Sequence, residues 1–195
     1  MTPLKVTGDD DADALLNQNP LALMIGMLLD QQIAIELAFK GPYRLAQRLD
    51  ESHGLALDAS AIAGLDVDSV VELFAAKPAL HRFPASMAKR THDLCRHLVD
   101  SHEGDPTTIW RQAGNGAELA RTLRALPGFG AEKTRIFIAL LAKRFGVTPE
   151  GWQQAAGAFS DDLARSVADV DDPAVLAEIR SYRAELKKAG KPKDG

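Results

Sequence analysis

One stretch of the chain, residues 117–146, constrains the fold more than any other. It reads AELARTLRALPGFGAEKTRIFIALLAKRFG. Three leucines recur at helical spacing in its first part and predict a helix. Residues 127–130, PGFG, then interrupt that helix, because proline removes a backbone donor and glycine permits φ > 0. A second helix starts near Ala131 and is apolar on nearly every side, which predicts that it is buried.

The glycines of this turn predict an anion-binding site. The first N–H groups of a helix have no intrahelical partner and carry the positive end of the helix dipole, so they favour a phosphate. Gly128 and Gly130 let a ligand approach the backbone closely. Lys133 and Arg135, in the first turn of the second helix, suit a polyanion better than they suit the dipole. On the hairpin alone, an ordinary tight turn between two core helices is the alternative interpretation.

The composition narrows the class of protein. With 195 residues, the chain can bury a core as one large domain or as two small lobes. No apolar run reaches the roughly 18 residues of a membrane span, and the first residues lack the layout of a signal peptide. A single cysteine, Cys95, excludes an internal disulfide and a cysteine-ligated iron–sulfur cluster. We expect a cytoplasmic protein, and a monomer that carries no cofactor.

The charge is distributed unevenly. A formal net charge of −4 argues mildly against a nucleic-acid partner, because dedicated DNA binders usually have an excess of basic residues. Residues 77–144, however, contain twelve Lys and Arg against six Asp and Glu, and a locally basic face can bind phosphates. Three histidines, His92, His97 and His102, are five residues apart and do not share a helix face, so we expect no metal site.

No segment alternates as a strand does, so the pattern predicts an all-α chain of about nine to twelve helices. A nearly apolar helix, with Asn19 as its cap and Pro20 at its first position, should run to about Lys40 and end at Gly41 and Pro42. In its middle stand Asp30, Gln31 and Gln32, which either lie at an exposed bend or face a site, because unpaired polar groups are costly to bury. We also expect a helix over residues 161–170 and a disordered tail over residues 187–195.

Three segments in order resemble the helix-hairpin-helix (HhH-GPD) DNA glycosylase superfamily, the group of endonuclease III and 3-methyladenine DNA glycosylase II. They are the apolar helix with DQQ at its centre, residues 83–106 (FPASMAKRTHDLCRHLVDSHEGDP) and LPGFG with its following helix. More narrowly, the chain is similar to a small actinobacterial-type branch of that superfamily.

The resemblance implies two helical lobes with a DNA-facing cleft between them. Residues 19–146 would form one lobe, and residues 1–18 with 147–195 the other. Double-stranded DNA would be the partner. The family's glutamine that reaches the opened DNA maps onto Gln31 and Gln32. The hairpin contacts would come from Gly128, Phe129, Gly130, Lys133 and Arg135.

This chain differs from the family pattern at the catalytic lysine of the family's lyase members. That lysine stands two residues after the second hairpin glycine, where this chain has Glu132. Lys133 is one residue further on, a rotation of about 100°. Its amine should therefore point away from the cleft, towards phosphate or solvent, and we expect no lyase activity. Glu132 is better interpreted as a first-turn acid that favours the helix dipole than as a catalytic group.

The catalytic aspartate of the family is harder to assign. The usual spacing ends near residues 150–153, which contain no Asp. The next candidates are Asp162 and then Asp161, in FSDDL, a stretch similar to the Asp-Asp of the 3-methyladenine branch; both could instead cap the next helix. Asp30 is a third candidate and, with Trp152, a candidate pocket residue, whereas Asp169 should lie on the surface.

Two functions follow from these assignments. The first is a base excision repair enzyme, a monofunctional DNA glycosylase that flips out and removes a damaged base. The second is a non-catalytic DNA- or lesion-binding protein that kept the hairpin and lost the carboxylate. A helical protein with no role on DNA is a third interpretation, which the net charge alone supports.

Overall fold

The structure is a computed structural model that describes residues 2–190. All regular secondary structure in these residues is helical. The predicted all-α class is therefore confirmed for this part of the chain. The elements are α1 (Asp10–Gln18), α2 (Pro20–Leu29), α3 (Ile35–His53), α4 (Ala59–Gly64), α5 (Val67–Ala75), α6 (Pro84–His102), α7 (Thr107–Arg111), α8 (Gly116–Ala125), α9 (Ala131–Phe145), α10 (Trp152–Ala156), the 3-10 turns η1 (Gly157–Ser160) and η2 (Val167–Asp169), and α11 (Val175–Lys188).

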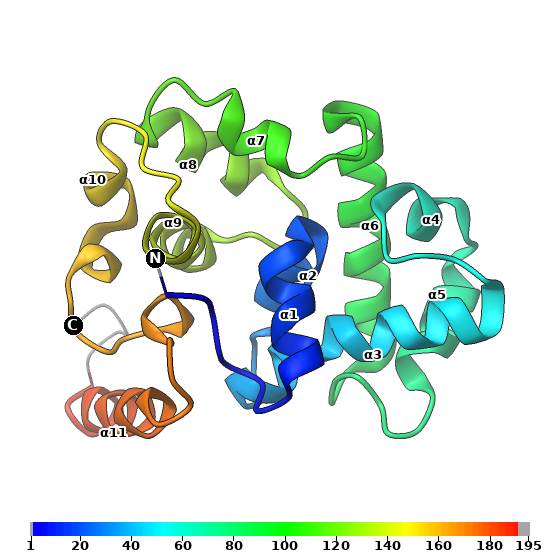
Figure 1. Ribbon diagram of the computed structural model, residues 1–195, viewed down its shortest axis with the longest axis horizontal. Helices are drawn as coiled ribbons and strands as arrows, with labels where there is room; N and C mark the ends of the chain where they lie inside the picture. Colours follow the sequence, from blue (N-terminus) through cyan, green and yellow to red (C-terminus); the bar gives the residue numbers. More distant parts are fainter. Residues whose placement is uncertain (1, 191–195) are drawn as a thin grey trace.

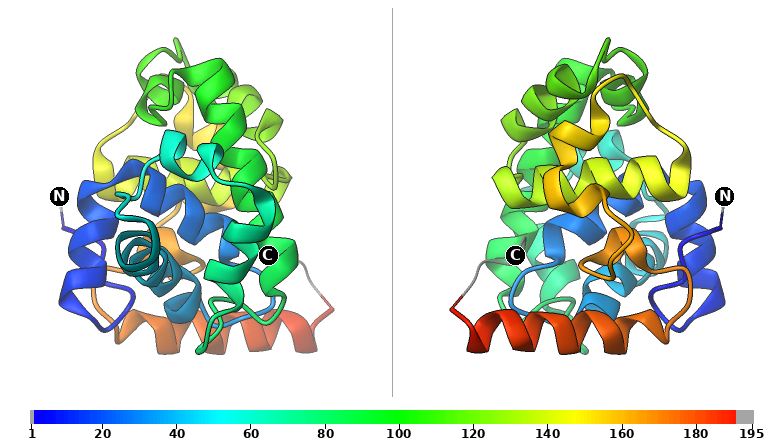
Figure 2. Two further views of the ribbon diagram at one scale, coloured as in Figure 1. Left: turned by 90° about the vertical axis from the view of Figure 1, so that its right-hand side faces the viewer. Right: turned by 90° about the vertical axis from the view of Figure 1, so that its left-hand side faces the viewer.

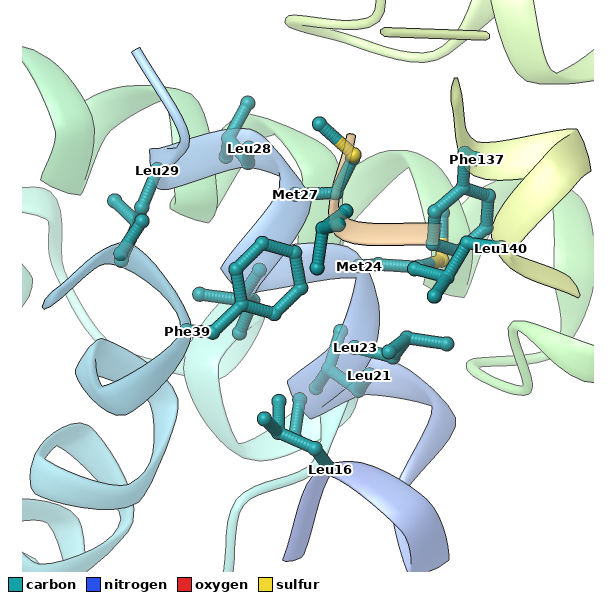
Figure 3. Close-up of a cluster of buried hydrophobic side chains, with 14 of the residues drawn as sticks. Leu16, Leu21, Leu23, Met24, Met27, Leu28, Leu29, Phe39, Phe137 and Leu140 are labelled. Carbon is teal, nitrogen blue, oxygen red and sulfur yellow. The ribbon is translucent and has the colours of Figure 1, made fainter. Parts of the chain in front are cut away.

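Helix α2 is the centre of the core. Asn19 caps its N-terminus, Pro20 occupies its first turn, and residues 21–29 are all buried. Phe39 of α3 packs on one side of α2, and Phe137 and Leu140 of α9 lie on another (Figure 3). A Cβ on Gly26 would be 2.7 Å from the Phe39 ring, so the absence of a side chain there lets α3 pack closely.

The remaining helices surround α2. Figure 1 shows α3 to α6 on one side of it and α9 to α11 on the other. Helices α4 and α5 pack against α6, and α8 and α10 pack against α9. The last helix, α11, runs along one edge of the molecule (Figure 2) and is tied to α3 by an ion pair between Arg180 and Glu36. Among the described residues, no helix has the length and apolarity needed to cross a membrane.

The single helix expected over residues 20–40 is wrong, because the chain turns at residues 30–34. Gln32 has a φ of 58°, a left-handed conformation that a continuous helix does not contain. Helix α3 then continues through Gly41 and Pro42, where the pattern predicted an end. Both residues are buried, and a Cβ on Gly41 would be 2.6 Å from the Leu29 side chain. Close packing of α3 on α2 thus offsets the hydrogen bond that proline removes.

Two expectations for the C-terminal part also need correction. Residues 161–170 form only the short turn η2, because the Asp161 carboxylate bonds the Leu163 N–H and the Arg165 side chain instead of starting a helix. The disordered tail expected over residues 187–195 is wrong at its start, since α11 extends to Lys188; residues 191–195 lie outside the described part. The division into lobes of residues 19–146 and of 1–18 with 147–195 stays a prediction; α1 packs against α2 and α3.

Candidate nucleic-acid interface

The hairpin between α8 and α9 is a tight turn of defined type. The Phe129 N–H donates to the Leu126 carbonyl over 3.1 Å, and Gly128 has a φ of 82°. Proline followed by a glycine with positive φ is the arrangement of a type II turn. A Cβ on Gly128 would overlap the Cδ1 atom of Leu28, which lies on α2. Gly128 is therefore required both by the turn and by its contact with the centre of the core.

The hairpin presents backbone rather than side chains to the surface. Phe129, expected at the DNA, is only 3% exposed, and its ring packs edge-on against Phe137 at 5.6 Å between centroids. Its side chain belongs to the core, so a ligand can reach only the main chain at this position. Gly130 is exposed and caps α9 without a side-chain hydrogen bond, and a Cβ built on it would meet nothing within 4 Å. The first N–H groups of α9 thus begin at an open surface, as anion binding requires.

Lys133 anchors the hairpin to α2. Its ammonium group donates to the carbonyl of Met27 over 2.8 Å and also to the carbonyl of Leu28. The expectation that this amine points at phosphate or solvent is therefore corrected. The last carbonyls of a helix carry its negative end, and a cation stabilises them. This contact fixes the start of α9 beside the loop that follows α2.

That loop, residues 30–34, contains the glutamines predicted at the DNA, and the structure gives them different surroundings. The Gln31 amide donates to the Leu28 carbonyl and to the Met87 sulfur, both over 3.1 Å, and accepts from Arg90 over 3.3 Å. Gln32 is exposed. Gln31 thus stabilises the loop through its side chain, whereas Gln32 extends from it. Asp30 is the C-cap of α2, directly before both, and Glu132 is half-buried in the first turn of α9.

A second loop, before α6, joins this surface and was not predicted as part of it. His81 is 3% exposed; its Nε2 lies 2.9 Å from the Gln31 carbonyl oxygen, and its Nδ1 accepts the Phe83 N–H over 3.0 Å. The two contacts together require a neutral ring with its proton on Nε2. Burial lowers the pKa of His81, and the nearby charges of Lys133 and Arg82 lower it further, against a raising effect from the Gln31 carbonyl.

The same loop exposes an aromatic ring. Phe83 is 44% exposed, and the guanidinium of Arg82 lies over its ring at 4.8 Å from the centroid. The signal available in the sequence was a basic and an aromatic residue, Arg82 and Phe83, between Pro78 and Pro84. Because His81 bonds this loop to Gln31, the loop that carries the exposed ring lies beside the glutamine loop.

Asp161 and Asp162 lie in a different part of the molecule. The Asp161 carboxylate accepts two hydrogen bonds from Arg165, at 2.9 Å from Nε and 2.7 Å from Nη2. The backbone carbonyl of Asp161 accepts a hydrogen bond from the Lys143 ammonium group. The hydrogen bond from Arg165 lowers the pKa of Asp161. Lys143 follows Lys133 by ten residues, about 15 Å along α9. Asp161 is thus anchored to the C-terminal half of α9, away from the hairpin, and Asp162 beside it is exposed.

Asp169, expected on the surface, has a side chain only 9% exposed and an ion pair of 2.6 Å with Lys143. It also forms a capping box with Ser166. These contacts explain its burial, and the surface assignment is wrong.

Trp152 lies away from the hairpin, whereas Arg135 lies near the start of α9. Trp152 begins α10, and its backbone nitrogen would be 2.7 Å from a Cβ on Gly116. Gly116 is the first residue of α8, and the hairpin follows the last residue of that helix. Trp152 therefore lies at the end of α8 that is away from the hairpin. Arg135 lies one turn into α9, with its guanidinium over the Phe159 ring at 5.9 Å. The structure therefore brings the hairpin glycines, Lys133, Asp30 and the two glutamines together, without Trp152. Among the described residues, no group of three His, Cys, Asp or Glu side chains could hold a metal ion.

This arrangement of a type II hairpin beside a glutamine loop agrees with a comparison with known families. The family model of the HhH-GPD superfamily base excision DNA repair proteins matches residues 25–191. The chain belongs to the HhH-GPD superfamily. As a member of this DNA-binding superfamily, it is a base excision DNA repair protein. No curated protein and no solved structure matches the chain significantly. The narrower actinobacterial-type branch stays a prediction.

Proposed function

We propose that this HhH-GPD protein is a cytoplasmic, monomeric DNA glycosylase that binds damaged duplex DNA and removes one damaged base by hydrolysis. The observation that carries the proposal is the single surface formed by the hairpin, the glutamine loop and the loop before α6. Lys133 and Gly128 join the first two through α2, and His81 joins the last two through Gln31.

Each part of this surface suits a task on an opened duplex. The open N-terminus of α9 at Gly130 suits a backbone phosphate, which positions the strand. Gln32 extends from the surface in a left-handed conformation, a strained backbone of the kind found at functional sites. The exposed Phe83 ring offers a stacking face for a base. A base must leave the stack before its glycosidic bond can be cleaved, and such side chains can fill the space that it leaves.

The chemistry requires a carboxylate beside the sugar. Positive charge develops on the sugar as the bond breaks, and a carboxylate stabilises that charge or takes a proton from the attacking water. Water adds to the sugar carbon, and the base departs with the bond's electron pair and a proton. Among the three candidates we propose Asp30 first, because it directly precedes Gln31 on the hairpin surface. Asp162 comes next, and Asp161 last, because its carboxylate is held by Arg165.

A specific observation favours the alternative of a non-catalytic lesion-binding protein. The aspartates that follow the hairpin in sequence are attached to the C-terminal half of α9 through the contact of Lys143 with Asp161. In this alternative Asp30 is only a helix cap, and the surface recognises damage without cleaving the bond.

The test incubates the full chain with duplexes that each carry one alkylated, deaminated or oxidised base. Alkali then cleaves the strand at any abasic site. We expect strand breaks after alkali, and none before it, on one class of lesion. Asp30→Asn should lose excision and keep DNA affinity, while Asp161→Asn should excise normally. If no duplex yields an abasic site while affinity falls steeply with salt, the lesion-binding alternative holds. If Asp30→Asn excises fully and Asp162→Asn does not, the carboxylate is Asp162.

A further inference from the structure

A basic hollow lies beside the hairpin, on the side of α9 that faces α8 and α10. Its volume is about 560 Å³. Arg121 and Arg124 line it from α8, and Arg135 lines it from α9, while three alanines leave the space between them open. None of the side chains that line the hollow is acidic.

The spacing of the arginines explains why they meet. Arg121 and Arg124 are three residues apart on α8 and share one side of that helix. Arg135 is four residues after Ala131, which also lines the hollow, so both lie on the same side of α9. Arg121 has an ion pair of 3.7 Å with Glu118, but both side chains are exposed, and such a pair is weak. Three like charges around one space raise its positive potential and favour an anion there.

A buried hydroxyl in the same lining is the second observation. Thr134 lines the hollow and is only 3% exposed, and its Oγ1 atom has no hydrogen-bond partner. A buried polar group without a partner is unfavourable, so such groups usually mark a place where a ligand or water completes the site. A threonine hydroxyl can donate one hydrogen bond to a phosphate oxygen.

We propose that this hollow binds a second phosphate of the DNA backbone, separate from the phosphate at the hairpin amides. Guanidinium groups bind phosphate through paired N–H donors, and we assign the Thr134 hydroxyl, which has no partner in the protein, as a neutral donor to the same phosphate. Ala131 lines the hollow and directly follows Gly130, so the two phosphate sites lie next to each other at the start of α9. This inference rests on the proposed function, and it extends the contact with the strand from the hairpin towards α8.

The first test measures duplex affinity over a range of salt concentrations. Each phosphate contact contributes about 0.9 to the slope of log K against log salt. In the double variant Arg121→Gln with Arg124→Gln, this negative slope should become less steep by about 0.9. A control with the same loss of charge, Arg96→Gln with Arg111→Gln, changes exposed arginines on α6 and α7 and should leave the slope unchanged. Equal slopes for the two double variants overturn the proposal.

The second test separates a ligand role from a structural one. Thr134→Val keeps the shape of the side chain and removes only the hydroxyl. If the hydroxyl merely lacks a partner, the variant should be as stable as the parent or more stable, with unchanged DNA affinity. If it binds phosphate, affinity should fall several-fold while thermal stability is kept or raised. Unchanged affinity in Thr134→Val removes the hydroxyl from the site.

Two further arms distinguish this inference from the proposed function. Gly130→Asp places a negative charge at the hairpin and should abolish binding if the hairpin contacts DNA at all; no effect of Gly130→Asp overturns the proposed function. If Gly130→Asp loses DNA binding while the Arg121 and Arg124 double variant keeps the parent's salt dependence of binding, only the second phosphate site is overturned. Inorganic phosphate at matched ionic strength is the last probe. One outcome is that inorganic phosphate raises the melting temperature of the parent chain but not of Thr134→Val, while the salt dependence of DNA binding is the same in the parent and in the Arg121 and Arg124 double variant. In that case the hollow binds free phosphate and not the strand.

Discussion

The ammonium group of Lys133 lies 2.8 Å from the carbonyl oxygen of Met27 and also donates to the carbonyl of Leu28. This contact joins the first turn of α9 to the last turn of α2, across more than a hundred residues of sequence. It places the hairpin and the glutamine loop on one surface. In this chain the lysine nearest to the family's catalytic position is thus a structural link.

Replacing Lys133 with methionine should therefore weaken the fold. The change keeps the aliphatic stem and removes a charged donor from two carbonyls, a loss of about 1.5–3 kcal/mol. Urea unfolding followed by circular dichroism measures it. Lys89→Met, at an exposed position of α6, is the matched control and should change stability by less than about 0.5 kcal/mol. Equal stability of the two variants would show that the contact is not stabilising.

The same contact predicts that no covalent intermediate forms on abasic DNA. A Schiff base forms when an amine nitrogen attacks the sugar carbonyl carbon, whereas the Lys133 nitrogen is anchored to the carbonyl oxygens of Met27 and Leu28. Borohydride reduction in the presence of an abasic duplex should therefore trap no protein–DNA adduct. A lyase of the same superfamily serves as the positive control. An adduct that disappears in Lys133→Met would contradict this prediction.

The two hairpin glycines should respond differently to alanine. Gly128→Ala requires a methyl group at a φ of 82° and in the space of the Leu28 side chain, which should cost about 2–4 kcal/mol. Gly130 has a φ of −80° and open space around its Cα, so Gly130→Ala should leave stability within about 0.5 kcal/mol. Thermal unfolding of both variants tests this. Similar losses in the two variants would show that the turn does not have this geometry.

The sequence predicts the hairpin well because the turn is local. Pro127 and Gly128 determine it within four residues, and the apolar residues of α9 place that helix in the core. The expected direction of the Lys133 amine, towards phosphate or solvent, is wrong. Its partner on α2 could not be predicted, because that contact depends on how two distant helices pack.

The errors have the same origin. Asp161 and Asp162 have the pattern of a helix start, but Arg165 and Lys143 bind Asp161 and no α-helix starts at these residues. His81 contacts Gln31 across fifty residues, and nothing in the local pattern of either residue indicates it. The left-handed conformation of Gln32 is hidden as well, because apolar residues continue on both sides of the loop.

That conformation predicts opposite effects of one substitution on stability and on binding. Gln32→Gly should relieve the left-handed strain and raise stability by up to about 1 kcal/mol. It should also lower the preference for a lesion-containing duplex over an undamaged one, because the exposed amide is lost. Glu103 has the same strain, with a φ of 55° at the end of α6, so Glu103→Gly is a control that should gain stability and keep the preference. Binding titrations on both duplexes decide; an unchanged preference in Gln32→Gly would remove Gln32 from the interface.

His81 should make stability depend on pH in the weakly acidic range. Its folded pKa is lowered from an ordinary value of 6.5, chiefly by burial, so the unfolded chain binds the proton first as the pH falls. The contribution of neutral His81 is therefore complete above about pH 6.5 and declines below it, until the pH passes the folded pKa. A proton on Nδ1 would also break the hydrogen bond from the Phe83 N–H and loosen the loop against Gln31.

In His81→Gln the decline in stability at acidic pH should be absent, so the stability advantage of the parent chain should shrink between pH 7.5 and pH 5. Urea unfolding across that range measures it, with the exposed His53→Gln as control. The interpretation of His81 fails if His81→Gln keeps the parent's slope of unfolding free energy against pH.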